Sequence, residues 1–213
     1  MAIPVFKTLE TPEYIEKLLE HSHRRKFPAR NTILRQGDPA NELLYVIEGS
    51  VSVLLEDEKG HEIVLAYLNE GEFFGELGLF VDNVERVAYV RGRTPCEIAY
   101  ISYDKVRKLA TEYPDLLFHI SRQLAKRLMK TNRKVGSLAF MDVYGRVSRT
   151  LLDLCKEPDA MTHPDGMQIR ITRQELGRIV GCSREMVGRV LKEMEEQLQI
   201  TVSGKTIVVL GVR

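Results

Sequence analysis

Residues Arg173–Lys192, with the sequence RQELGRIVGCSREMVGRVLK, decide the architecture of the C-terminal third of the chain. Leu176, Ile179 and Val180 recur at the spacing of one helical face, so the first half predicts a helix with a buried side. Gly181 follows where a tight turn needs a positive φ, which glycine adopts without steric cost. The stretch therefore predicts two helices joined by a short turn, a helix-turn-helix.

The second helix of this stretch is expected to begin after Ser183, whose hydroxyl can cap it. Gly177, in the first helix, is small enough to let the second helix cross closely. The residues of the second helix that we expect to be buried are Met186, Val187, Val190 and Leu191. Those that we expect to face outward are Arg184, Glu185, Gly188, Arg189 and Lys192.

The outward-facing residues suit the reading of DNA. Arginine pairs with the two acceptors of guanine in the major groove, and a carboxylate accepts from cytosine N4. Arg184, Glu185 and Arg189 are therefore candidates for base contacts, whereas Arg173 and Lys192 suit phosphate contacts. The alternative is an ordinary helical hairpin with a charged face, and the small residues at the crossing and the turn argue against it. The net charge of +1 decides nothing by itself.

The segment from about residue 31 to residue 101 has the texture of a β structure. Short apolar runs at Leu43–Ile47, Val51–Leu55 and Ile63–Leu68 predict strands, and Asp57–Gly60 between two of them predicts a hairpin turn. Glycines recur along the segment at roughly regular intervals. Many short strands with even turn spacing are typical of a small barrel or jelly roll.

A long helix is expected to begin near Pro114, which suits a first helical turn. Its apolar seam advances in alternating steps of four and three residues, the a/d pattern of a coiled coil. The seam comprises Leu117, Ser121, Leu124, Leu128, Thr131, Val135 and Leu138. The pattern favours a two-stranded coiled coil, and hence a homodimer, over a helix packed only on its own domain.

The last part of the chain mixes helices with a terminal β pattern at Thr206–Leu210, and a turn-rich segment at 157–166 predicts an exposed loop.

A second motif, GEFFGELGLF at Gly71–Phe80, is followed by Arg86. Glycines on both sides of Glu76 and Leu77 can let backbone N–H groups approach an anion at the start of a short helix. Arg86 can neutralise that anion with charge-assisted hydrogen bonds, and Glu76 can accept from a sugar hydroxyl. The alternative is that these glycines merely form turns of the β structure.

Several classes of function are not expected. The three cysteines, Cys96, Cys155 and Cys182, lie in mostly apolar surroundings without metal-ligand spacing, which predicts buried side chains and no metal site. The five histidines show no nucleophile–base pattern, so we expect no enzyme. No apolar run is long enough to cross a membrane, and Met1–Lys7 lacks the features of a signal peptide, which indicates a cytoplasmic protein.

Together these motifs resemble the CRP/FNR family of bacterial transcription regulators, and within it the branch of cAMP receptor proteins. The similarity covers nearly the whole chain. It is strongest at residues 49–54, 75–80, 134–136, 158–192 and 204–209. It implies an α+β fold in three parts: a cyclic nucleotide-binding β-roll at 1–113, a dimerisation helix at 114–139 and a winged helix-turn-helix at 140–213. The family's redox branch carries an N-terminal cysteine cluster, which this chain lacks.

The resemblance implies that cAMP is an allosteric effector, with Glu76 on the ribose hydroxyl and Arg86 on the cyclic phosphate. Thr131 and Asn132, one of them from the partner subunit, would reach the adenine. The implied ligand contacts are Leu65, Gly75, Glu76, Leu77, Gly78, Arg86, Val87, Thr131 and Asn132. The implied contacts to double-stranded DNA are Arg173, Gln174, Ser183, Arg184, Glu185, Gly188, Arg189 and Lys192. RNA polymerase would meet the loop 160–168, at Thr162, His163, Pro164 and Gly166.

Two positions depart from the pattern of the close relatives. Val87 replaces a serine that helps to bind phosphate, and Asn132 stands where serine or threonine is usual. The charge partner Arg86 is retained, so cAMP remains the expected ligand. The open alternatives are a regulator of the same architecture that responds to cGMP or cyclic di-GMP, or one that binds DNA without ligand. A β-roll that regulates an enzyme or a channel is disfavoured by the helix-turn-helix.

Overall fold

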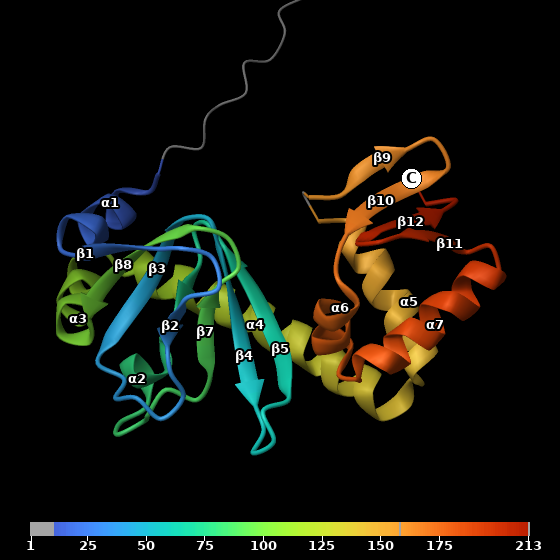
Figure 1. Ribbon diagram of the computed structural model, residues 1–213. Helices are drawn as coiled ribbons and strands as arrows, with labels where there is room; N and C mark the ends of the chain where they lie inside the picture. The colour runs from blue at the N-terminus through green and yellow to red at the C-terminus, as the bar shows by residue number, and fades with distance from the viewer. Residues whose placement is uncertain (1–10, 158, 213) are drawn as a thin grey trace, which may run out of the picture. The chain divides into compact units, whose positions relative to one another are not determined.

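The computed structural model describes residues 11–157 and 159–212 (Figure 1). Residues 1–10, the segment in which a signal peptide would lie, are outside the described residues. Within those ranges no helix is long and apolar enough to span a bilayer.

Two four-stranded antiparallel sheets make up most of the N-terminal half, as the β pattern predicts. The first sheet has the order β1 (His23–Phe27), β8 (Cys96–Ser102), β3 (Glu42–Glu48), β6 (Phe73–Phe74). The second has the order β2 (Thr32–Leu34), β7 (Tyr89–Gly92), β4 (Ser50–Glu56), β5 (Glu62–Asn69). The three strands predicted from apolar runs are thus confirmed as β3, β4 and β5.

The turn between β4 and β5 is the predicted hairpin turn. Asp57 Oδ1 accepts hydrogen bonds from the backbone N–H groups of Lys59 and His61 at 2.9 and 2.8 Å. Gly60 has a φ of +79°, a conformation that side chains with a β-carbon rarely adopt. An aspartate that bonds to the backbone two residues on is a standard way to close such a turn.

Apolar packing involves both faces of the first sheet. One cluster draws on strands of both sheets: Leu44, Val46, Val51, Leu68, Phe74, Val90, Cys96, Ile98 and Tyr100. The other cluster packs helices against Leu43, Phe73 and Ile101 of the first sheet. These helices are α1 (Glu13–Glu20), α2 (Leu77–Phe80), α3 (Tyr103–Glu112) and the start of α4 (Asp115–Phe140).

Helix α4 matches the long helix predicted near Pro114, and its two faces differ sharply in burial. Leu116 and Ile120 are fully buried in the core of the N-terminal domain. On the predicted seam, Leu128 and Val135 are 62% and 59% exposed. The first turns therefore pack on their own domain, which is the alternative considered from the sequence, whereas the seam keeps an uncovered apolar face.

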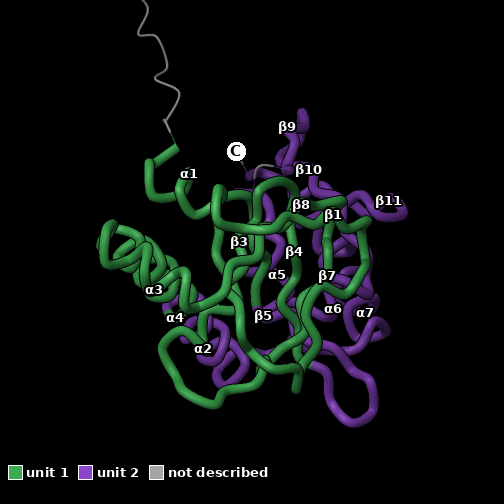
Figure 2. The backbone as a smooth tube through the Cα atoms, turned by 90° about the vertical axis from the view of Figure 1, so that its left-hand side faces the viewer, with its two compact units in different colours: residues 1–55, 66–128 green, residues 56–65, 129–213 purple. Residues whose placement is uncertain are grey.

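The chain divides into two compact units (Figure 2). The first contains residues 1–55 and 66–128, and the second contains residues 56–65 and 129–213. The tip of the β4–β5 hairpin thus belongs to the same unit as the C-terminal part of the chain.

The C-terminal part joins three helices to a four-stranded sheet of order β11-β12-β10-β9. Its elements are α5 (Val143–Leu154), β9 (Met161–His163), β10 (Gly166–Arg170), α6 (Arg173–Val180), α7 (Arg184–Glu196), β11 (Ile200–Ser203) and β12 (Thr206–Leu210). Apolar residues of all three helices and of β10, β11 and β12 form its core. The predicted strand at 206–210 is confirmed, and the hairpin of β11 and β12 forms the wing.

Two expectations for this part need correction. The segment 157–166 is not loop throughout, because Met161–His163 pairs with β10 as an edge strand. Met186 is 37% exposed, although we expected it to be buried. Val187, Val190 and Leu191 are buried as predicted, and Met194 one turn later completes their face. Cys96 and Cys155 are buried as expected, and Cys182 is half-buried.

Candidate ligand site and nucleic-acid interface

Both glycines beside Glu76 occupy positions where a side chain has no room. Gly75 has a φ of +73°, and a β-carbon there would lie 2.5 Å from Arg86 Nη1. A β-carbon on Gly78 would lie 2.7 Å from the ring of Tyr103. Glycine is thus needed here for close packing as well as for the turn.

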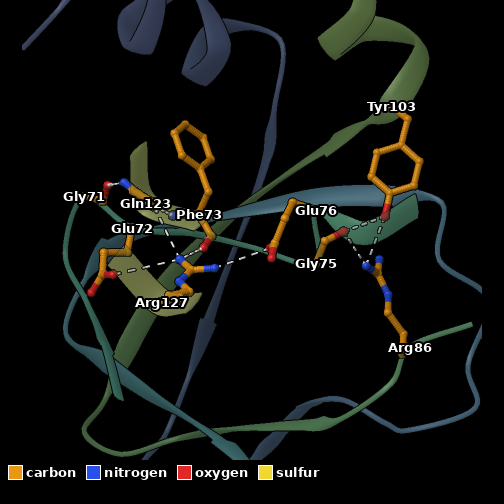
Figure 3. Close-up of polar contacts among 9 residues, drawn as sticks. All are labelled: Gly71, Glu72, Phe73, Gly75, Glu76, Arg86, Tyr103, Gln123 and Arg127. Atoms are coloured by element: carbon orange, nitrogen blue, oxygen red, sulfur yellow. Dashed lines mark hydrogen bonds and ion pairs between the residues drawn. The ribbon is translucent and has the colours of Figure 1, made fainter. Parts of the chain in front are cut away.

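Arg86 is buried and fixed by three acceptors, two of which, on Gly75 and Tyr103, are drawn in Figure 3. Its Nη1 donates to the carbonyl of Gly75 at 2.8 Å and to the hydroxyl of Tyr103 at 3.2 Å. Its Nη2 donates to the carbonyl of Glu42 at 2.8 Å. The buried Nε has no hydrogen-bond partner among the described residues. A buried donor without a partner carries a desolvation cost, so this guanidinium retains capacity for an acceptor.

Glu76 is held from the other side by α4. Arg127 Nη1 lies 3.4 Å from Glu76 Oε2, and Nη2 of the same side chain donates to the carbonyl of Phe73 (Figure 3). Arg127 also lies 3.8 Å from the carboxylate of Glu72. In the sequence, Arg127 is only one of several basic residues on a helix. The one hint of its contact with Glu76 is that it follows Gln123 by four residues, which places both side chains on the same helical face.

The other predicted ligand contacts fall into two groups. Leu77 and Val87 lie in the first compact unit with Glu76 and Arg86, and both are exposed, at 39% and 52%. Leu65, Thr131 and Asn132 belong to the second unit, in which all three are exposed. Within the first compact unit, the structure brings together the part of the predicted set that surrounds the Gly75–Gly78 turn.

The helix-turn-helix has the local geometry that the sequence predicts. Gly181 has a φ of +76°, and a β-carbon on Gly177 would lie 2.7 Å from the carbonyl of Cys182. Ser183 caps α7 by accepting from the N–H of Met186 at 3.2 Å. The turn thus needs a residue that tolerates a positive φ, and the crossing leaves no room for a side chain.

The outer face of α7 is charged and open. Arg184, Glu185, Arg189 and Lys192 are exposed, and they line one depression together with Arg173 of α6. Hydrogen bonds from its own backbone N–H and from Ser183, and then the nearby arginines, lower the pKa of Glu185. Its side chain is therefore a carboxylate at neutral pH, the form that accepts from cytosine.

The wing adds a basic residue that the sequence did not single out. Lys205 lies in the turn between β11 and β12 and lines a second depression with Arg173, Gln174 and Arg184. A lysine beside the first residues of α6 suits a phosphate contact. In the sequence, Lys205 is marked only as a basic residue that follows a glycine.

The hairpin of β9 and β10 carries the residues predicted to meet a protein partner. Thr162 and Pro164 are exposed, and His163 is half-buried. Gly166 is buried, and a β-carbon there would collide with the backbone carbonyl of Val209. Gly166 therefore has a packing reason of its own, which the sequence alone did not show.

Two family models match the chain. The cyclic nucleotide-binding domain matches residues 24–113, and the Crp-like helix-turn-helix domain matches residues 145–212. The first match contains the Glu76 and Arg86 turn, and the second contains both helices of the helix-turn-helix.

Curated relatives resemble the chain over almost its full length. The cAMP-activated global transcriptional regulator Vfr of Pseudomonas aeruginosa is 58% identical, covering 94% of this chain and 95% of that protein. The cAMP-activated global transcriptional regulator CRP of Salmonella typhimurium is 56% identical, covering 96% and 97%. Among solved structures, the c-di-GMP-responsive global regulator CLP of Xanthomonas campestris is 49% identical with a TM-score of 0.90, covering 94% of this chain and 100% of that chain. The chain therefore belongs to the CRP family of transcriptional regulators, with an N-terminal cyclic nucleotide-binding domain and a C-terminal Crp-like helix-turn-helix domain.

Proposed function

We propose that the protein is a cAMP-responsive transcriptional regulator that binds palindromic promoter sites as a homodimer. The main support for ligand sensing by the N-terminal domain is the burial of charged side chains at the Gly75–Gly78 turn. Among the described residues, the buried polar or charged residues are Ser50, Glu76 and Arg86. Burying a charged group costs free energy unless the group has a partner. A ribose hydroxyl matches the carboxylate of Glu76, and a cyclic phosphate matches the guanidinium of Arg86.

DNA recognition by the C-terminal domain is supported by the exposed face of α7. Arg184 and Arg189 offer paired donors to guanine, and Glu185 offers a carboxylate to cytosine. Arg173 and Lys192, and Lys205 on the wing, supply positive charge for phosphates. The chemistry here is recognition rather than catalysis, so we propose a regulator without enzymatic activity that acts where bacterial DNA lies, in the cytoplasm.

The homodimer is supported by the uncovered seam of α4. Leu128, Val135 and Leu138 are 62%, 59% and 41% exposed, at the heptad spacing of a coiled coil. A second copy of the same helix has the matching spacing. Two-fold symmetry would place two recognition helices about 34–36 Å apart, the spacing of helix-turn-helix dimers on DNA, among them the catabolite activator protein.

The switch follows from differential affinity. Ligand that binds more tightly to one conformation of the dimer shifts the population toward it, and the shift is limited by that difference in affinity. We propose that the favoured conformation presents both α7 helices to one face of the duplex. The exposed residues Thr162 and Pro164, with His163, would then meet RNA polymerase.

Cyclic di-GMP is the second candidate for the effector, because the similar regulator CLP is described as responsive to it. Val87, 52% exposed beside Arg86, offers no hydroxyl to a phosphate, whereas Arg86 and Arg127 offer charge to either nucleotide. Calorimetry of the full chain against cAMP, cGMP and cyclic di-GMP separates these ligands.

The deciding experiment measures DNA affinity for a palindromic TGTGA-type site with and without each nucleotide. We expect cAMP to tighten binding in the wild type and to have no effect in Arg86→Gln. Arg24→Gln, a change of an exposed arginine on β1, is the matched control and should respond like the wild type. A wild type whose DNA affinity is the same with and without cAMP would overturn the proposal.

A further inference from the structure

A polar chain along one face of α4 ends at the proposed ligand site. His119, Gln123 and Arg127 follow one another at intervals of four residues, which places them on the same helical face. Arg127 reaches the carboxylate of Glu76, as described above. All these residues lie in the first compact unit, so the polar chain does not cross from one unit to the other.

Gln123 uses its complete hydrogen-bonding capacity. Its Oε1 accepts from the N–H of Phe73 at 2.8 Å and from Arg127 Nη2 at 3.3 Å. Its Nε2 donates to the carbonyl of Gly71 at 2.9 Å (Figure 3) and lies 3.0 Å from His119 Nε2. A glutamine amide has two hydrogens and two acceptor positions, and here each has a partner.

This arrangement determines where the proton of His119 lies. Because Gln123 Nε2 is a donor, His119 Nε2 must be the bare nitrogen that accepts from it. The hydrogen of the neutral ring then belongs to Nδ1, which lies 3.2 Å from the hydroxyl of Tyr14 on α1. The orientation of the amide is in turn set by Phe73 and Gly71, which offer one backbone donor and one backbone acceptor.

We propose that His119 and Gln123 are positioning residues for the ligand site, and that effector binding requires His119 to be neutral. The proposal rests on the proposed function for the identity of the site. Protonation of His119 would place an N–H group against the amide hydrogens of Gln123. If the amide turned over instead, its NH2 group would face the N–H of Phe73 and the guanidinium of Arg127, and its oxygen would face the carbonyl of Gly71. Either outcome loosens the residues that hold Arg127 and the turn beside Glu76.

The surroundings of His119 favour the neutral ring. Burial lowers the pKa of His119, and the charges of Arg122 and Lys126 on the same helix lower it further. Helix α1 presents the hydroxyl of Tyr14, and β6 presents the edge-on ring of Phe73 at 5.5 Å between centroids. None of these groups is an acid that would stabilise the protonated form.

The test is the dissociation constant of the full chain for cAMP between about pH 8 and about pH 5, a range across which histidine titrates. We expect the wild type to weaken below the pKa of His119, by up to about tenfold for each further pH unit. His119→Gln should bind severalfold more weakly than the wild type at the upper end, because the ring packing on Phe73 is lost, but should change little with pH. His21→Gln, which removes an exposed histidine, should keep the pH profile of the wild type.

Nitrogen-15 NMR of the imidazole gives an independent readout. We expect the neutral ring to carry its hydrogen on Nδ1. A hydrogen on Nε2, or a cAMP affinity of the wild type that stays constant over the pH range, would overturn the inference. A wild type that binds no cyclic nucleotide even at the upper end would overturn the proposed function, whereas the NMR result would still decide the tautomer.

Discussion

Arg178 of the first helix of the helix-turn-helix forms an ion pair with Glu62 of the β4–β5 hairpin, with 2.9 Å between Nη2 and Oε2. The side chain of Glu62 is only 10% exposed, whereas that of Arg178 is 39% exposed. Close by, Lys134 of α4 donates to the backbone carbonyl of Val64. These contacts lie within the second compact unit and join the hairpin tip to α6 and to α4.

Arg178→Gln should therefore weaken the attachment of the hairpin. A partly exposed pair contributes at most about 1 kcal/mol, so we expect a small loss of stability. Hydrogen exchange of residues 56–65 should rise in the variant.

A double-mutant cycle with Glu62→Gln isolates this interaction. We expect a coupling energy of about 0.5–1 kcal/mol. Strict additivity of the two single changes would show that the pair contributes nothing.

Gly181→Ala tests the turn of the helix-turn-helix. A φ of +76° strains alanine, and its β-carbon would lie 3.3 Å from Leu138 Cδ2. We expect a loss of about 1–2 kcal/mol in the free energy of unfolding, measured by denaturant titration. Gly136→Ala on α4 is the matched control, because nothing lies within 4 Å of a β-carbon there. That change should stabilise the helix by about 0.5–1 kcal/mol, and an equal loss in both variants would contradict the argument.

Lys134 should give stability a distinctive dependence on pH. Burial lowers the pKa of Lys134 to about 8. Since the ordinary value is about 10.4, the unfolded chain binds more protons between these values, and stability should rise as pH increases through that window. Below about pH 8 the burial cost is fully present.

The free energy of unfolding is measured against pH for the wild type and for Lys134→Met, in which the rise in stability should be missing. We expect the difference between the two proteins to change by about 1 kcal/mol across the window, because the group is partly solvated. Lys130→Met, an exposed position on the same helix, should retain the rise of the wild type. Parallel profiles for all three proteins would rule out a buried ammonium at position 134.

Two residues of α7 should fail in different ways when they are changed. Arg189→Ala should cost about 1–3 kcal/mol of DNA affinity and relax selectivity at one base pair, because a base contact is lost. Lys192→Ala should weaken binding to all sequences alike and reduce the slope of log affinity against log salt by about one. Fluorescence titration on matched and mismatched sites at several salt concentrations distinguishes these outcomes, and equal loss of selectivity in both would refute the assignment.

The elements predicted from the sequence with most success are those closed by short-range contacts. The turn at Asp57–Gly60, the left-handed Gly181 and the cap by Ser183 each depend on partners within four residues, so a local pattern suffices to predict them. The length of α4 followed from its apolar periodicity. Met186 was misjudged because periodicity alone does not distinguish the edge of a buried face from its centre.

By itself, the sequence determined the α+β fold class, the helix-turn-helix with its outward arginines, and the turn around Glu76. Only the tertiary structure decided what surrounds those charges. Arg86 bonds to the backbone of Glu42, 44 residues away, and Arg127 reaches Glu76 across 51 residues. The same is true of Gln123 and of the pair between Glu62 and Arg178. The physical reason is that such contacts depend on which side chains the packed core brings together, and no repeat of 2 or 3.6 residues along the chain encodes that proximity.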